Sequence, residues 1–295
     1  MKLILVATDF SKAAAQALRY ASAIADRKGA RLLVIYADEF IPPLNETTTE
    51  LTKAGKSVDE LVAAVHEQLI AHVEANVSSY VPFVARIVVG DVAASIVTQA
   101  KDWDADLIVM GTHGRNGLRR LLVGSVCEAV LRTASIPVIA VNSLAADHPT
   151  FETKKIVCVV DYSPECAEAL RIAAELAPDA RIVLVKPEDG GRDPHGGDRV
   201  AQLRRWLPVD LVGRCELRLA GAFTPQHVAD FARLIGGDLI AAGFKTTGGL
   251  GDVLFGTTTD RIVQHSECPV LVVNASAVRE REQLVLAGAG CTCDA

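Results

Sequence analysis

The feature that most constrains the fold of this chain is an internal repeat. Three matches early in each copy are separated by 152 positions: Asp9 and Asp161, Ser11 and Ser163, and the Ala-Leu-Arg triplets at 17–19 and 169–171. Three later matches are separated by 132 positions: Gly111 and Gly243, Gly124 and Gly256, and Pro137 and Pro269. The chain is therefore predicted to be a tandem duplication whose second copy lacks 20 residues net, the difference between 152 and 132. Its 295 residues agree with two domains of about 150 residues each.

Within the first copy, short apolar runs alternate with stretches of helical periodicity. We expect strands at 2–7, 31–36, 84–89, 107–110 and 138–141, and helices at 12–28, 58–77, 92–100 and 125–136. Ser11 is a predicted N-cap, and Gly29 a predicted helix end. Residues 38–53, with two prolines and a run of threonines, are expected to form a surface loop, which a glycine-rich segment and a short helix near 200–206 replace in the second copy. The alternation predicts an α/β fold with two parallel sheets, each covered by helices on both faces.

Residues 106–141 read as strand, glycine loop, helix and strand. Glycine lacks a Cβ and tolerates positive φ, so N–H groups around Gly111 and Gly114 can line one hollow. Gly124 and Ser125 stand where the next helix begins, so the Ser125 hydroxyl and unpaired helix N–H groups add donors for an anion. Asp9 follows the first strand and can face the same crevice, because ligands bind beyond the strand carboxyl ends where strand order reverses. The sequence predicts a phosphate-binding loop, although glycines also occur in loops for purely steric reasons.

The segment GTHGRNGLRRLLVGSV, preceded by Met110 and followed by ASIPVIAV, resembles the nucleotide-binding signature of the universal stress protein family. The N-terminal LVATDFS, which contains Asp9, resembles the family's other diagnostic segment. The resemblance implies two tandem Rossmann-like (adenine nucleotide alpha hydrolase-like) domains, each with a five-stranded parallel sheet, at 1–143 and 153–275, followed by a C-terminal tail at 276–295. It also implies a stress-response or signalling protein of the ATP-binding branch, with ATP as the ligand and with Mg²⁺ left open.

The resemblance assigns ATP contacts residue by residue in the first repeat. It implies that Asp9 contacts the adenosine part and that the Tyr36 backbone meets the adenine, whereas Asp9 could instead simply bond nearby backbone N–H groups. The implied set is Asp9, Tyr36, Met110, Gly111, Gly114, Gly124, Ser125 and Val126. The second-repeat candidates are Asp161, Gly243, Gly256 and Thr257. Thr246 replaces Gly114 there and Lys245 replaces His113, so we expect the second loop to be degenerate.

Charge and composition narrow the classes of function. The net charge of −6 is spread over both halves, which argues against a general nucleic-acid partner. The seven cysteines are odd in number and scattered along the sequence, which favours a reducing cytosol over a disulfide framework. No apolar run approaches the ~20 residues of a membrane span, and the first apolar run is too short for a signal-peptide core, so we expect a cytoplasmic protein without a membrane partner.

Three functional hypotheses remain open from sequence alone. The favoured one is ATP binding without fast turnover, because neither a GxxxxGK[ST] P-loop nor a catalytic or metal-binding constellation is found; His113 has no paired carboxylate or cysteine. The second is a slow ATPase or nucleotide-transfer enzyme of the same superfamily. The third is a ligand-free dimerisation module, which suits the second repeat better than the first. The repeats are expected to pair as an intramolecular pseudo-dimer, as is common in the family, and a homodimer of chains is left open.

Overall fold

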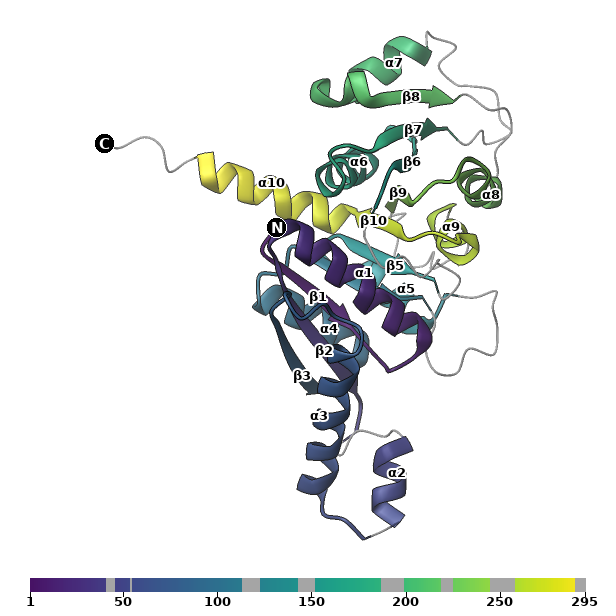
Figure 1. The fold of residues 1–295 in the computed structure, drawn as a ribbon. Coiled ribbons are helices and arrows are strands. Elements are labelled where there is room, and N and C mark those ends of the chain that lie inside the picture. The colour runs from purple at the N-terminus through teal and green to yellow at the C-terminus, as the bar shows by residue number, and fades with distance from the viewer. Residues whose placement is uncertain are drawn as a thin grey trace, which may run out of the picture. The chain divides into compact units, whose positions relative to one another are not determined.

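The structure, a computed structural model, describes residues 1–40, 46–53, 55–112, 123–142, 152–186, 199–218, 225–244 and 258–289 of the chain. The chain divides into two compact units (Figure 1). The first unit comprises Met1–Val130 and Val138–Phe151, and the second comprises Leu131–Pro137 and Glu152–Ala295. The end of the last helix of the first repeat therefore belongs to the second unit.

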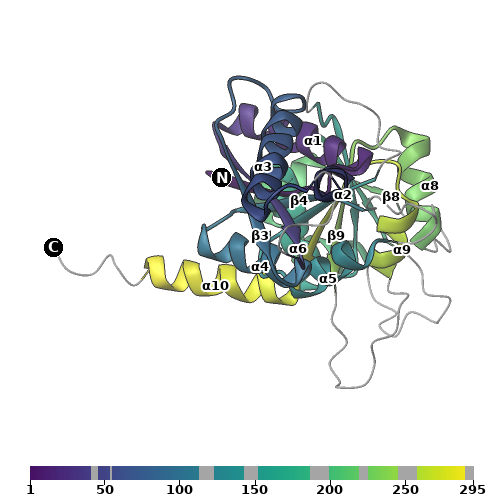
Figure 2. The same ribbon diagram turned by 90° about the horizontal axis from the view of Figure 1, so that it is seen from below.

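The first unit contains one parallel sheet with strand order β3-β2-β1-β4-β5. Its elements are β1 (Leu3–Ala7), α1 (Lys12–Lys28), β2 (Arg31–Asp38), α2 (Glu46–Lys53), α3 (Val58–Glu74), β3 (Phe83–Val89), α4 (Val92–Asp102), β4 (Leu107–Gly111), α5 (Ser125–Thr133) and β5 (Val138–Val141). Helices α1 and α3 cover one face of the sheet, and α4 covers the other (Figure 2). Strand order reverses between β1 and β4, which sets the position of a ligand crevice.

The second unit repeats this design, with strand order β10-β9-β6-β7-β8 and parallel pairing. Its elements are β6 (Lys155–Val159), α6 (Pro164–Leu176), β7 (Arg181–Val185), α7 (Arg199–Trp206), the 3-10 helix η1 (Val209–Arg214), β8 (Cys215–Arg218), α8 (Pro225–Ile235), β9 (Leu239–Phe244), α9 (Thr258–His265), β10 (Val270–Asn274) and α10 (Ala275–Ala289). Strand order reverses between β6 and β9. The predicted α/β class with parallel five-stranded sheets is confirmed.

Local sequence explains where the main elements begin and end. The Ala14 N–H donates to Ser11 Oγ at 3.2 Å to cap α1, and Gly29 ends that helix at φ 63°, as predicted. The first four residues of β1 are buried, so this strand packs on both faces of the sheet.

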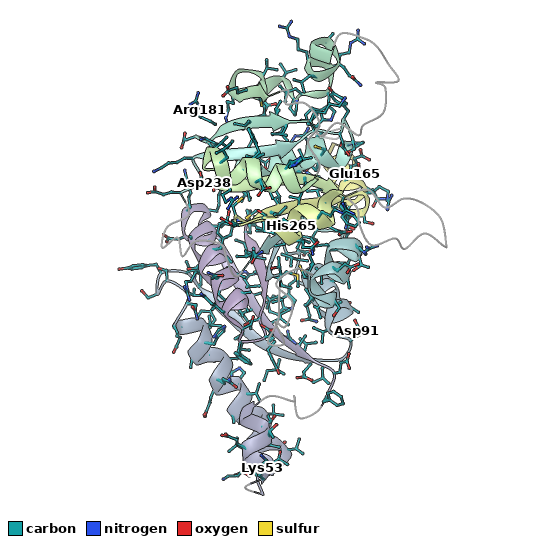
Figure 3. All side chains as sticks on the ribbon, turned by 90° about the vertical axis from the view of Figure 1, so that its right-hand side faces the viewer. Lys53, Asp91, Glu165, Arg181, Asp238 and His265 are labelled. Atoms are coloured by element: carbon teal, nitrogen blue, oxygen red, sulfur yellow. The ribbon has the colours of Figure 1, made fainter. Side chains whose placement is uncertain are left out.

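Matching aspartates hold the amino ends of the central strands in both units. Asp106 accepts from the N–H of Leu3 at 3.0 Å, and Asp238 accepts from the N–H of Lys155 at 2.8 Å. Figure 3 shows Asp238 and Arg181 on one side of the second unit, and Glu165 on the opposite side. Asp238 and Arg181 lie where β9 and β7 begin, whereas Glu165 lies in the first turn of α6, just beyond the carboxyl end of β6. The amino and the carboxyl ends of these strands therefore lie on opposite sides of the second unit.

Two segments contain a helix that the sequence did not predict. The expectation of a surface loop over 38–53 is wrong for residues 46–53, which form α2 beside α3 (Figure 1). Thr48 in α2 is only 1% exposed, and the Thr52 hydroxyl donates to the Thr48 carbonyl at 2.7 Å. Packing on α3 thus outweighs the weak helix propensity of threonine. The segment set apart as a tail at 276–295 contains most of helix α10.

Candidate functional site

The turn after β1 fixes Asp9 at the carboxyl end of a strand that borders the order reversal. The Ser11 N–H donates to Asp9 Oδ1 at 3.0 Å, and the Phe10 N–H donates to Thr8 Oγ1 at 3.2 Å. Between them Phe10 adopts φ 66°, a left-handed conformation that is uncommon for a residue other than glycine. Asp9 therefore has the local turn-forming role that the sequence left open, and this role also orients its carboxylate.

Aromatic side chains pack against the residue in the middle of this turn, Phe10. The Phe10 ring centre lies 4.9 Å from that of Tyr36 on β2 and 5.3 Å, edge to face, from that of His72 on α3. Tyr36 is fully buried, and its hydroxyl donates to Asp38 Oδ2 at 2.9 Å. Burial lowers the pKa of His72; the negative charge of Asp9 opposes this shift and the positive charge of Arg19 adds to it.

Close packing of a helix requires a glycine at position 111. A Cβ at this position would lie 2.9 Å from the Ala13 Cβ and 3.1 Å from the Ala14 backbone nitrogen, so the missing side chain lets α1 pack against the end of β4. The space that a Gly111 side chain would occupy is thus filled by α1. Met110, one residue earlier, is buried.

The start of α5 lies next to the end of β4, because two backbone hydrogen bonds hold them together. The Thr112 N–H donates to the Val141 carbonyl at 3.0 Å, and the Gly124 N–H donates to the Thr112 carbonyl at 2.7 Å. Gly124 is thereby held beside the end of β4, and α5 begins at the next residue, Ser125, which is exposed. Helix N-termini attract anions through unpaired N–H groups and the helix dipole. The start of α5 is consequently the part of the described site that suits a phosphate.

The structure brings several predicted site residues to one edge of the first sheet. Asp9 follows β1, and Gly111 ends β4, whose residues pair with β1 up to Ala7 and Met110. Gly124, Ser125 and Val126 lie at the start of α5, and Tyr36 is near the end of β2. Several residues named in the sequence analysis lie outside the described part of the chain: Gly114, His113, Thr246, Lys245, Gly256 and Thr257.

The second unit repeats the turn but changes the residues around it. The Ser163 N–H donates to Asp161 Oδ1 at 2.9 Å, and Tyr162 adopts φ 62°. A Cβ on Gly243 would lie 2.7 Å from the Cys166 backbone nitrogen, which matches the close approach at Gly111. The Thr259 hydroxyl donates to the Gly243 carbonyl at 2.6 Å. The backbone frame of the crevice is therefore the same in both units.

Two side chains distinguish the second crevice from the first. Lys186 follows β7 at the position where Tyr36 follows the corresponding part of β2, and its Nζ lies 4.9 Å from the centre of the Tyr162 ring. The Trp206 ring meets Tyr162 edge to face at 6.0 Å, and its Nε1–H donates to the Ser163 carbonyl at 3.2 Å. A cation and an indole thus stand where the first unit has a phenol and an imidazole.

Sequence reasoning missed the roles of His72, Lys186 and Trp206. Aligning the sequence of β7 with that of β2 makes Lys186 equivalent to Tyr36, so the change in charge can be seen in the sequence. His72 and Trp206 give no such signal, because each sits on a helix whose contact with the turn depends on tertiary packing. Among the described residues no group of three or more His, Cys, Asp or Glu side chains could hold a metal ion. No helix in that part of the chain is long and apolar enough to cross a membrane.

Two parallel sheets of this order, each with an aspartate turn facing the reversal of strand order, define a Rossmann-like α/β protein. The model of the universal stress protein family matches residues 1–142 and 216–274. This match spans more than half of the chain, and the chain belongs to the universal stress protein family. The resemblance drawn from the two sequence motifs is therefore confirmed.

Individual relatives agree with this assignment. A universal stress protein of Methanocaldococcus jannaschii is 33% identical over 157 residues, which span 48% of this chain and 82% of the relative. One from Thermus aquaticus is 35% identical over 143 residues, spanning 48% of this chain and 98% of the relative. The crystal structure of a universal stress protein from Archaeoglobus fulgidus superposes with a TM-score of 0.66 over 92% of this chain and 98% of that one, at 18% identity. This last likeness concerns the fold alone.

Proposed function

We propose that this universal stress protein binds ATP in the crevice of its first unit and acts in stress response or signalling rather than as a fast enzyme. The observation that carries the proposal is the convergence of Asp9, Gly124 and Ser125 at the reversal of strand order between β1 and β4. Asp9 supplies an oriented acceptor for hydroxyl groups of the adenosine, and the start of α5 supplies donors for the phosphates. Mg²⁺ would accompany the nucleotide on phosphate oxygens and water.

The proposal assigns different roles to the two units. The second unit keeps the aspartate turn, but Lys186 and Trp206 change the charge and shape around it. Tyr36 lies at the place that the family resemblance gives to adenine, and Lys186 takes that place in the second unit. We therefore place ATP in the first unit and expect the second to bind it weakly at most.

A matched pair of substitutions tests both parts of this proposal. Asp9→Asn and Asp161→Asn each keep an oxygen that can accept from the serine N–H, while they remove the charge. Losing a hydrogen bond to a charged acceptor costs about 1.5–3 kcal/mol, so Asp9→Asn should weaken ATP binding by about ten- to a hundredfold in calorimetric titration. Asp161→Asn should bind like the wild type. Equal losses in both variants, or no ATP binding by the wild-type chain, would refute the assignment.

Two further measurements separate binding from turnover. The supernatant of denatured, freshly purified protein should contain adenine nucleotide if the site is occupied in the cell. A steady-state phosphate-release assay should show no turnover beyond a slow rate. Release at the rates of ordinary enzymes, about 1–1000 per second, would favour the ATPase alternative instead.

A further inference from the structure

His72 is a titratable group next to the proposed site that the function above does not use. It lies in the last turn of α3, where its ring meets Phe10 edge to face at 5.3 Å. Its Nε2 is buried and has no hydrogen-bond partner among the described residues. A ring nitrogen in this position can stay neutral inside the packing, but a protonated one would be a buried charge without an acceptor.

The contact of His72 passes directly to the aspartate turn. Phe10 is the residue between Asp9 and Ser11, and it holds a left-handed conformation that the surrounding structure must maintain. Its ring contacts the rings of both Tyr36 and His72. Any displacement of the His72 ring therefore removes one of the two aromatic supports of the residue that follows Asp9.

The charged groups that shift the pKa of His72 come from two neighbouring elements. Asp9, in the turn after β1, favours the protonated ring, and Arg19 on α1 disfavours it. The Arg19 Nε–H donates to Asn76 Oδ1 at 2.9 Å, which keeps the guanidinium beside the end of α3. On β2, the Asp38 carboxylate accepts from the Tyr36 hydroxyl. A protonated His72 would be drawn toward Asp9, the carboxylate that the proposed function assigns to the nucleotide.

The second unit supplies an internal comparison. Trp206 meets the Tyr162 ring edge to face at 6.0 Å, as His72 meets Phe10, and both aromatic turn residues have φ above 60°. Indole does not titrate in the physiological range, so the same support is present there without a proton-dependent group. The contact itself is thus common to both units, while its sensitivity to pH is confined to the first.

We infer that His72 is a positioning residue for the nucleotide crevice: its neutral ring holds Phe10 and Asp9 in place, and its protonation in mild acid weakens ATP binding. This inference rests on the proposed function. The direction follows from linkage, because burial keeps the pKa of His72 below its ordinary value of 6.5. The stability supplied by the neutral ring is therefore complete above about pH 6.5 and decreases as pH falls toward the lowered pKa.

The test compares ATP affinity across pH in the full chain and two variants. His72→Phe keeps a flat ring against Phe10 but cannot titrate. His66→Gln removes an exposed histidine of the same helix and serves as the matched control. Phosphate groups of ATP themselves titrate near pH 6, so the quantity that matters is the difference between the wild-type and His72→Phe profiles between pH 7.5 and 5.5.

We expect the wild type to lose about three- to fivefold more affinity over this interval than His72→Phe, which corresponds to one unit of difference in pKa between the free and bound proteins when the free pKa lies just below 6.5. His66→Gln should follow the wild type. Superimposable wild-type and His72→Phe profiles, or a wild type that gains affinity in acid relative to His72→Phe, would overturn the inference while leaving ATP binding intact. A wild type that binds no ATP at pH 7.5 would instead overturn the proposed function, and this inference with it.

A second readout does not depend on ATP. The His72 ring proton, followed by NMR, should titrate with a midpoint below 6.5, and the Phe10 ring signals should shift with the same midpoint. A midpoint of 6.5 or above, or Phe10 signals that do not respond, would contradict the inference. Should His72→Phe fold poorly by circular dichroism, His72→Gln provides the non-titrating comparison.

Discussion

Replacing Asn274 should strongly destabilise the second unit, because this one side chain joins two helices there. Asn274 is 3% exposed, and its amide nitrogen donates to the carbonyls of Leu131 at 3.0 Å and Ala134 at 2.7 Å, at the end of α5. Its Oδ1 accepts from the N–H groups of Ser276 at 2.9 Å and Ala277 at 3.1 Å, at the start of α10. The residue thus satisfies the last carbonyls of one helix and caps the next.

The size of the effect follows from these bonds. Loss of an N-cap costs about 1 kcal/mol, and each of two carbonyls left without its donor costs about another 1 kcal/mol. Asn274→Ala should therefore reduce the free energy of unfolding of the second unit by about 3 kcal/mol. With a urea slope near 2 kcal/mol per molar, the midpoint should fall by about 1.5 M.

The chain offers a convenient assay, since it has two tryptophans and each unit contains one of them, Trp103 in the first and Trp206 in the second. In a Trp103→Phe background, fluorescence during urea unfolding reports on the second unit. Gln283→Ala, an exposed change on α10, is the control and should leave the midpoint in place. A shift below about 0.5 M for Asn274→Ala would show that the bonds of this side chain are replaced by water at little cost, and would refute the reasoning.

Asn274→Asp separates the two roles of the side chain. It keeps the acceptor for α10 but places a carboxylate against two carbonyl oxygens, which raises the pKa of the new acid. A folded-state pKa above the unfolded one adds stability at low pH that is lost as pH rises through the folded pKa. The variant should therefore be more stable at pH 5 than at pH 8 relative to wild type; the opposite order would mean that the carbonyl contacts are unimportant.

Two further predictions follow from close packing and burial. Gly111→Ala should destabilise the first unit by about 1–3 kcal/mol, because the new Cβ would meet α1 backbone, whereas Gly213→Ala, with nothing within 4 Å, should change little; equal thermal shifts would argue against the close approach. Burial raises the pKa of the Cys268 thiol to about 11, so at pH 8 iodoacetamide should label it about a hundredfold more slowly in folded than in unfolded protein; similar rates in peptide mass spectrometry would show that the thiol is open.

The strands and the first helix could be predicted from sequence because their signals are local. The apolar run of β1, the Ser11 cap and the Gly29 end each depend on residues within a few positions, and the structure places them as predicted. Helix α2 could not be predicted in this way. Its threonines are poor helix formers, and only burial of Thr48 against the rest of the unit stabilises them in a helix.

The candidate site divides in the same way. The match between Asp9 and Asp161 identified both turns. Parallel strands bring their carboxyl ends to the same side of a sheet regardless of the conformation of the loops. The packing of α1 against Gly111 could not be predicted, because a glycine that admits a helix and one that admits an anion look identical in sequence. Gly124, from the same predicted loop, is held just before α5 by the hydrogen bond from its N–H to the Thr112 carbonyl.

The two copies show which parts of the proposed nucleotide site a duplicated chain can vary without losing the fold. The left-handed residue, the serine cap and the glycine packed against the capped helix recur in both units, because each sets a backbone path that side chains of other shapes would block. Tyr36 near the end of β2, Lys186 just after β7, and the rings from α3 and α7 contact the turn without setting that path. Exchanging tyrosine for Lys186 and histidine for Trp206 there alters charge and proton uptake while the strands keep their register. Differences in ligand and in pH response between the units should accordingly depend on these positions. Exchanging the residues at these positions between the units should exchange the ligand preference and the pH response without unfolding either unit.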